Sequence, residues 1–309
     1  MTQPMDILRQ FPVRKSKQQK AAFRSEVSTY LQSLGYSVSE ESGSFGVRNL
    51  VAGDPERASW LVTAHYDTCA RLPFPNLITP CNFWLFLGYQ LLIVLAMLLI
   101  PGVPALPVCL LTRNGEVTYL VWYVCLLVVF VLMLVGPANP SNANDNTSGV
   151  VTLLEMARTM PENQRNRVCF VLFDLEEAGL LGSAAYRKAH KSASERQIVL
   201  NLDCVGDGDT IMLFPSKKLK KDGRKLAALE RISGPVGKKA ICVRSCGFSV
   251  YPSDQAHFPY GVGVCALRTG KAGIYLGRIH TRRDTILEET NVNILRSALI
   301  SLITCGAAE

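Results

Sequence analysis

The stretch "RVCFVLFDLEEAGLLGSAAY", residues 167–186, indicates the fold class of this chain. An apolar run of strand length leads to two adjacent carboxylates, Glu176 and Glu177, and then to a segment with helical periodicity. On a regular strand these carboxylates would point to opposite faces, and as neighbours they repel each other. Either both are solvated surface residues, or a cationic group lies in front of them.

Strands alternate with helices along most of the chain. The patterns predict helices at about 16–35, 148–160, 180–190, 216–232 and 292–305, and strands at 36–40, 45–53, 59–65, 167–174, 197–203, 210–214, 239–245 and 261–268. This alternation predicts an α/β sandwich with a mostly parallel mixed central sheet. In such sheets ligands bind at the carboxyl ends of the strands.

Two uncharged apolar segments, residues 83–100 and 117–135, interrupt this pattern. Each is long enough to cross a hydrocarbon core of about 30 Å, and aromatic residues flank both. Two buried core helices are the alternative, but helices without a polar face would leave a large apolar surface exposed. We therefore expect an inserted transmembrane hairpin over 77–136 that contacts the lipid bilayer through residues 83–135, and one soluble domain made of 1–76 and 137–309.

The composition bears on compartment and partners. The N-terminus lacks an apolar stretch of signal-peptide length, and the ten cysteines form no CxxC pair or regular framework, which favours a reducing compartment. We expect an integral membrane protein whose catalytic domain is cytoplasmic. Much of the net charge of +8 lies between residues 187 and 244, and its densest part is a basic segment, residues 216–225. This segment is either a solvated helix face or a contact for anionic lipid or nucleic acid. No motif indicates nucleic-acid binding.

Five short motifs carry possible metal ligands near strand ends: "AHYDT" (64–68), "SNANDNTSG" (141–149), "DLEEAG" (174–179), "NLDCVG" (201–206) and "RIHTRRDT" (278–285). His65 and Asp67 are two residues apart, so one can bind a metal while the other orients the imidazole. Singly, each motif is more often structural. Together, two of only four histidines and several carboxylates form a nitrogen and oxygen ligand set that suits zinc, and two ions better than one.

These five motifs, together with "SDQAHF" (253–258), resemble in order and context the co-catalytic zinc aminopeptidase family. That family includes bacterial leucyl aminopeptidases, glutamate carboxypeptidases and glutaminyl cyclases. The resemblance covers the chain except the apolar insertion, and it implies a single three-layer α/β/α sandwich around a mixed sheet.

The resemblance also implies two zinc ions and a ligand for each position. Asp145 would bridge the two ions through its two oxygens. One ion would take His65 and Asp203, and the other Glu177 and His280.

Two further residues receive roles from the resemblance. Asp67 would be the partner of His65 that fixes its ring. Glu176 would stay free of metal and act as general base towards a water molecule activated by zinc. His190 and His257 are interpreted as structural or surface residues, although the loop with His257 approaches the substrate in the family.

The chain departs from the family pattern by its apolar insertion and by the absence of an export signal. We expect a membrane-anchored metallo-aminopeptidase or dipeptidase that acts on peptides with a free N-terminus. Asp145 lies ten residues beyond Val135, within roughly 35 Å of the membrane, so apolar, membrane-proximal peptides are the expected substrates. The alternatives are a glutaminyl cyclase and a non-catalytic membrane adaptor.

Overall fold

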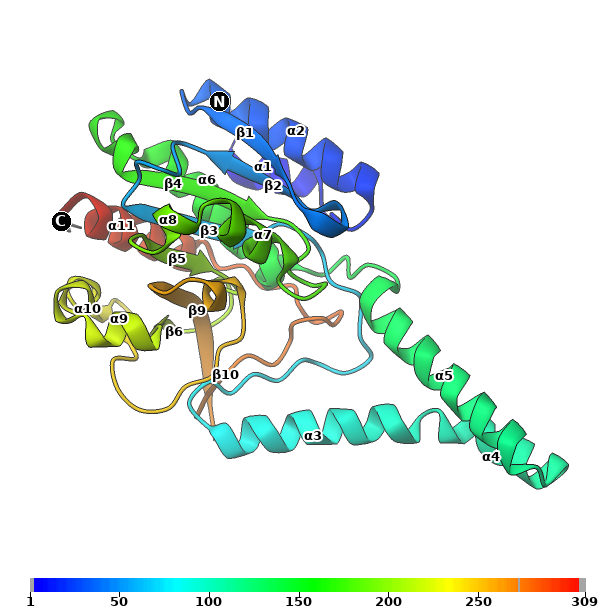
Figure 1. The fold of residues 1–309 in the computed structure, drawn as a ribbon. Helices are drawn as coiled ribbons and strands as arrows, with labels where there is room; N and C mark the ends of the chain where they lie inside the picture. Colours follow the sequence, from blue (N-terminus) through cyan, green and yellow to red (C-terminus); the bar gives the residue numbers. More distant parts are fainter. Residues whose placement is uncertain (1–2, 272, 306–309) are drawn as a thin grey trace.

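A ten-stranded mixed sheet forms the centre of the protein, as seen in a computed structural model that describes residues 3–271 and 273–305 (Figure 1). The strand order is β1-β2-β4-β3-β5-β9-β6-β8-β7, with β10 paired to β9. The strands are β1 (Val38–Ser42), β2 (Arg48–Ala52), β3 (Trp60–His65), β4 (Val168–Phe173), β5 (Ile198–Leu202), β6 (Thr210–Pro215), β7 (Gly234–Val236), β8 (Lys239–Val243), β9 (Gly261–Gly270) and β10 (Gly273–Tyr275).

The middle of the sheet is parallel. Strands β4, β3, β5 and β9 run in the same direction, whereas β6 runs antiparallel to β9, and β2 antiparallel to β4. All six residues of β3 and of β4 are buried, because helices cover both faces of a central parallel strand. The predicted fold class, a three-layer sandwich with a mostly parallel mixed sheet, is confirmed.

Helices cover the two faces. Those of the sandwich are α1 (Pro4–Gln10), α2 (Lys17–Ser33), α6 (Gly149–Thr159), α7 (Leu181–Ala189), α8 (Lys191–Ser194), α9 (Lys217–Lys221), α10 (Gly223–Glu230) and α11 (Glu289–Cys305). Short helical turns lie at η1 (Ser44–Gly46), η2 (Ala143–Ser148), η3 (Glu162–Arg167) and η4 (Asp254–His257).

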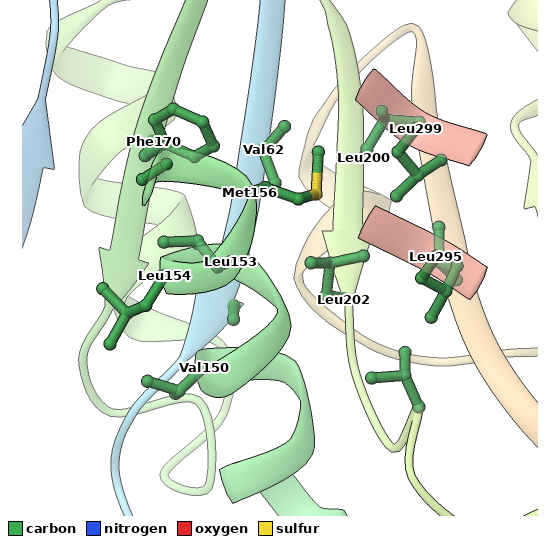
Figure 2. Close-up of a cluster of buried hydrophobic side chains, with 14 of the residues drawn as sticks. Val62, Val150, Leu153, Leu154, Met156, Phe170, Leu200, Leu202, Leu295 and Leu299 are labelled. Atoms are coloured by element: carbon green, nitrogen blue, oxygen red, sulfur yellow. The ribbon is translucent and has the colours of Figure 1, made fainter. Parts of the chain in front are cut away.

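The larger core lies between the sheet and helices α6 and α11. Figure 2 shows Leu153 and Met156 of α6 facing Val62 of β3, with Leu295 of α11 beside Leu202 of β5. A smaller core on the opposite face includes Tyr186 of α7. The sheet is therefore held rigidly from both sides, which fixes the ends of its strands.

Several elements differ from the sequence-based expectation. The basic helix expected up to residue 232 is two helices, α9 and α10, because Asp222 adopts extended backbone angles and its side chain accepts a hydrogen bond from Lys225 N. Helix α1 and the three-residue strands β7 and β10 were not predicted, since such short segments carry too little periodicity.

Three apolar helices project from the sandwich: α3 (Phe83–Leu99), α4 (Gly102–Thr112) and α5 (Gly115–Val135) (Figure 1). Helix α4 occupies the segment expected only to connect the other two, and it packs along α5. By length and composition, 83–112 and 115–135 could each cross a membrane, and none of the most apolar window of α5 is buried.

Candidate metal centre

Three parallel strands bring most of the predicted site residues to one edge of the sheet. His65 is the last residue of β3, Glu176 and Glu177 follow β4, and Asp203 follows β5. Because β3 lies between β4 and β5, the carboxyl ends of the three strands meet. His65 pairs in register with Phe173, the last residue of β4.

Two loops add the remaining predicted ligands. Asp145 lies in η2, directly before α6, and His280 lies between β10 and α11. The carboxylate of Asp284 accepts hydrogen bonds from the backbone N–H of Asn144, at 2.8 Å, and of Asp145, at 3.0 Å. Asp284 thus connects the two loops and fixes the orientation of Asp145.

The two oxygens of Asp145 face two different histidines. Its Oδ1 lies 3.2 Å from His65 Nε2, and its Oδ2 lies 3.0 Å from His280 Nε2. His65 Nε2 also lies 3.8 Å from Asp203 Oδ1, and His280 Nε2 lies 3.6 Å from Glu177 Oε2. The five predicted ligands therefore form two donor sets that share Asp145.

These separations suit zinc. Two donors that each lie about 2.1 Å from a tetrahedral zinc ion are roughly 3.4 Å apart, which falls within the observed range. One group of donor atoms within 4.8 Å of one another comprises His65, Glu176 and Asp203, and another includes Asp145, Glu177 and His280. Glu177 Oε1 is buried without a hydrogen-bond partner, as expected of an atom that could bind a cation.

The site carries an excess of negative charge. The basic side chains at or next to it are those of His65, His280 and Arg14. The carboxylates there are more numerous: Asp67, Asp145, Glu176, Glu177, Asp203, Asp254 and Asp284. Buried anions need a cationic partner. Bound metal cations would supply the missing positive charge.

Burial raises the pKa of the two neighbouring glutamates. The pKa of Glu177 rises to about 8, mainly through desolvation, although His280 opposes the shift. Desolvation also raises the pKa of Glu176 well above its usual range, against the influence of His65. Burial opposes ionisation of Asp145 too, but its contacts with His280 and His65 hold its pKa well below the usual range.

Asp67 explains how two adjacent carboxylates can lie in one site. Its Oδ1 accepts a hydrogen bond from Glu176 N at 3.1 Å, and its Oδ2 accepts one from Glu177 N at 3.2 Å. The same carboxylate lies 3.4 Å from His65 Nδ1. One side chain therefore faces the ring of His65 and also holds the turn after β4.

Three residues around the site received no role from the sequence. Ser253 Oγ donates to Asp203 Oδ2 at 2.6 Å, and Asp284 holds the loop with Asp145 as described above. Arg14 is fully buried and donates from Nε to Tyr66 O at 2.6 Å. Ser253 and Asp284 lie within motifs that the sequence singles out, whereas Arg14 lies in a segment without any motif.

The remaining candidates have other surroundings. His257 Nδ1 lies 2.8 Å from Ser183 Oγ, and His190 lies between Glu41 and Glu56. Cys69 also belongs to the donor group around Glu177, a contact that the sequence analysis did not predict. Burial raises the pKa of the Cys69 thiol far above its usual range, which disfavours the thiolate that binds metals.

Known peptidases share parts of this sequence. The model of peptidase family M28 matches residues 131–302, more than half of the chain. Aminopeptidase YwaD of Bacillus subtilis (strain 168) is 40% identical over 73 residues, which are 23% of this chain and 16% of that protein. The chain thus aligns with only about a sixth of the length of this curated relative.

Solved structures share the fold. A glutaminyl cyclase of Porphyromonas gingivalis superposes with a TM-score of 0.60 and 16% identity, covering 97% of this chain and 96% of that one. A Zn-dependent exopeptidase of Parabacteroides distasonis gives a TM-score of 0.61 and 13% identity over 97% and 94% of the two chains. LapA of Legionella superposes with a TM-score of 0.60 and 14% identity, covering 99% of this chain and 72% of that one.

Proposed function

Because this chain belongs to peptidase family M28, we propose that it is a zinc-dependent aminopeptidase that hydrolyses the N-terminal residue from peptides. The observation that carries this proposal is that Asp145 turns its two oxygens towards two different histidines. This arrangement suits a shared ligand between two metal ions. His65 and Asp203 would complete one position, and Glu177 and His280 the other.

When bound, the two zinc ions supply Lewis-acid polarisation of the scissile carbonyl and activation of water. The chain's own residues would hold the ions and move the proton. Glu176 belongs to the donor group of His65 and Asp203, and desolvation raises its pKa, as suits a proton carrier. Its carboxylate would take a proton from water as oxygen attacks the carbonyl carbon, and would deliver it to the amine nitrogen as the C–N bond breaks.

Asp67 would act as a positioning residue. It faces His65 Nδ1, where a carboxylate fixes the tautomer and orientation of a metal-binding imidazole. Its bonds to the backbone of Glu176 and Glu177 would hold the proposed base and a proposed ligand at a fixed separation.

The proposal includes an anchor in the bilayer. Residues 1–76 and 137–309 would form the catalytic domain, and the insert at 77–136 would cross the membrane and return, with the catalytic domain in the cytoplasm. The exposure of apolar side chains along α3 and α5 supports this assignment over that of core helices.

A cavity of about 600 Å³ supports apolar, membrane-proximal peptides as substrates. Its lining includes both Asp67 and Glu177 of the site and Leu134 and Val135, the last residues of α5. An apolar peptide leaving the bilayer would therefore meet a surface that continues from α5 to the proposed metal centre.

The decisive experiment combines a zinc count with an aminopeptidase assay on the detergent-solubilised chain. Glu176→Gln should keep the zinc content of the wild type and lose about 100- to 10,000-fold in kcat. Glu162→Gln, which alters an exposed surface glutamate, should change neither quantity. A Glu176→Gln protein that retains more than a few per cent of the wild-type activity would refute the assignment of the base.

Glutaminyl cyclisation is a second candidate, because solved glutaminyl cyclases share the fold over nearly the whole chain. Incubation with a Gln-initiated peptide and with a leucyl amide separates the two activities. Pyroglutamyl product without any released amino acid would favour the cyclase. Absence of stoichiometric zinc together with no turnover of either substrate would favour a membrane adaptor.

A further inference from the structure

A basic pocket lies where the apolar helices join the sandwich. The cavity has a volume of about 510 Å³ and is lined by Arg71, Leu72, Pro73, Pro75, Thr281, Arg282 and Arg283. All three arginines are exposed. Within residues 3–271 and 273–305, none of their guanidinium groups forms an ion pair or a hydrogen bond, so all three are available to an anion.

Two hydrogen bonds place this pocket next to both outer apolar helices. Arg71 N donates to Pro137 O at 2.9 Å, two residues beyond the end of α5. Tyr89, in α3, donates its hydroxyl to Pro75 O at 2.5 Å. The pocket therefore lies between the ends of α3 and α5 that adjoin the sandwich.

We propose that this pocket binds the phosphate headgroup of an anionic phospholipid. The proposal rests on the membrane anchor described above, because a bilayer that holds α3 and α5 would bring the ends that adjoin the sandwich to the depth of the headgroups. Guanidinium groups bind phosphate oxygens through paired hydrogen bonds. Basic pockets beside the cytoplasmic ends of membrane helices are typical sites for such lipids.

The pocket is joined to the candidate metal centre. Leu72 N donates to His280 O at 2.8 Å, and Thr281 and Arg282 directly follow His280 in the chain. His280 has a φ of +63°, in the left-handed region that a non-glycine residue adopts at a cost. A headgroup bound by Arg71 and Arg282 would connect the two loop segments next to His280 and so stabilise the position of His280.

The test measures lipid binding to the full chain in detergent micelles by native mass spectrometry. Phosphatidylglycerol is titrated against phosphatidylcholine, with inorganic phosphate and glycerol phosphate as soluble competitors. The wild type should bind one phosphatidylglycerol in preference to phosphatidylcholine. Arg282→Gln with Arg283→Gln should weaken this binding by roughly 30-fold, from the usual contribution of two basic residues near anionic lipid.

A matched control removes two positive charges outside the pocket and away from the apolar helices α3, α4 and α5. Arg57 precedes the amino end of β3, whereas Arg71 lies beyond its carboxyl end, and Arg231 follows α10. Arg57→Gln with Arg231→Gln should leave lipid binding unchanged. An equal loss of phosphatidylglycerol binding in both double variants, or no loss in either, would refute the pocket as the binding site. Displacement of the lipid by inorganic phosphate at equal concentration would overturn the lipid as its ligand.

The outcome can be separated from that of the proposed function. Extraction of the chain from membranes by alkaline carbonate without detergent would refute the anchor itself. Retention in the membrane, with zinc-dependent peptidase activity but equal lipid binding by both double variants, would refute only the headgroup site.

Discussion

Asp67→Asn is expected to weaken zinc binding by 10- to 100-fold while the protein remains folded. The Asp67 carboxylate accepts two backbone hydrogen bonds, from Glu176 N at 3.1 Å and Glu177 N at 3.2 Å, and faces His65 Nδ1 at 3.4 Å. An amide keeps one acceptor oxygen and presents an NH₂ group where the other oxygen was. At least one charge-assisted hydrogen bond is lost, at a cost of about 1.5–3 kcal/mol.

The same magnitude follows from metal chemistry. Removing the carboxylate partner of a metal-binding histidine typically costs 10- to 100-fold in affinity, which is about 1.4–2.8 kcal/mol. Competition with a chromophoric chelator measures the zinc affinity of wild type and variant. An unchanged affinity of Asp67→Asn would refute the proposed coupling between Asp67 and the metal positions.

Asp54→Asn is the matched control. Asp54 also accepts two backbone hydrogen bonds, from Glu56 N and Arg57 N, but it lies in an exposed turn before β3. Its replacement should leave zinc affinity at the wild-type value. A similar loss in both variants would trace the effect to general destabilisation.

Three further outcomes are expected. Gly182→Ala should lower the melting temperature, because a Cβ there would lie 2.2 Å from Asp174 O, and such overpacking costs about 1–3 kcal/mol or more; Gly223→Ala, with open space around it, should not. Burial lowers the pKa of His190, but its two glutamate partners raise that pKa above 6.5 overall. The imidazolium therefore stabilises the fold fully below pH 6.5, and this contribution disappears as the pH rises through the folded-state pKa. His190→Gln should therefore melt below the wild type at pH 6 and match it in alkaline buffer, and a constant difference would contradict this. Replacing residues 83–135 by a flexible linker of about 12 Gly and Ser residues should give a zinc-binding domain that elutes as a monomer without detergent; aggregation would support core helices instead.

Much of the sheet was predictable because its central strands are short apolar runs bounded by polar motifs. The strands β3, β4 and β5 all fall within predicted segments, since full burial between two helical layers requires continuous hydrophobicity, and β9 extends its predicted segment by two residues. Strand order was not predictable from periodicity. The position of β9 between β5 and β6 depends on contacts between residues far apart in the sequence.

The candidate site was predictable where ligand types occur in recognisable motifs. His65, Asp145, Glu177, Asp203 and His280 converge, and each was expected from a short stretch of sequence. Their supporting residues were not predictable in the same way. Arg14 acts through contacts with Tyr66 and Thr147, and neither its neighbours nor its spacing indicates that it is buried.

The position of the apolar insertion has a structural explanation and a consequence. Ala70 and Ala138 form an antiparallel bridge, and Cys69 O accepts a hydrogen bond from Asn139 N at 3.0 Å, so the chain leaves and re-enters the sandwich at neighbouring points. Lengthening a connection between adjacent points adds little closure entropy, and helices satisfy their own backbone hydrogen bonds. The sheet can therefore accept α3, α4 and α5 without rearrangement of its strands.

The same short connections tie the insertion to the candidate metal centre. The chain between Ala138 and Asp145 is short, and on the other side Leu72 N holds His280 O. A displacement of α5 relative to the sheet would therefore act on Asp145 and His280, the two residues that come from loops. His65 ends a strand that the core fixes, and Glu177 and Asp203 follow two further such strands, so these three residues would stay in place. Under the proposed function, a movement of α5 in the bilayer would therefore shift Asp145 and His280, while the sheet keeps the other three ligands in place.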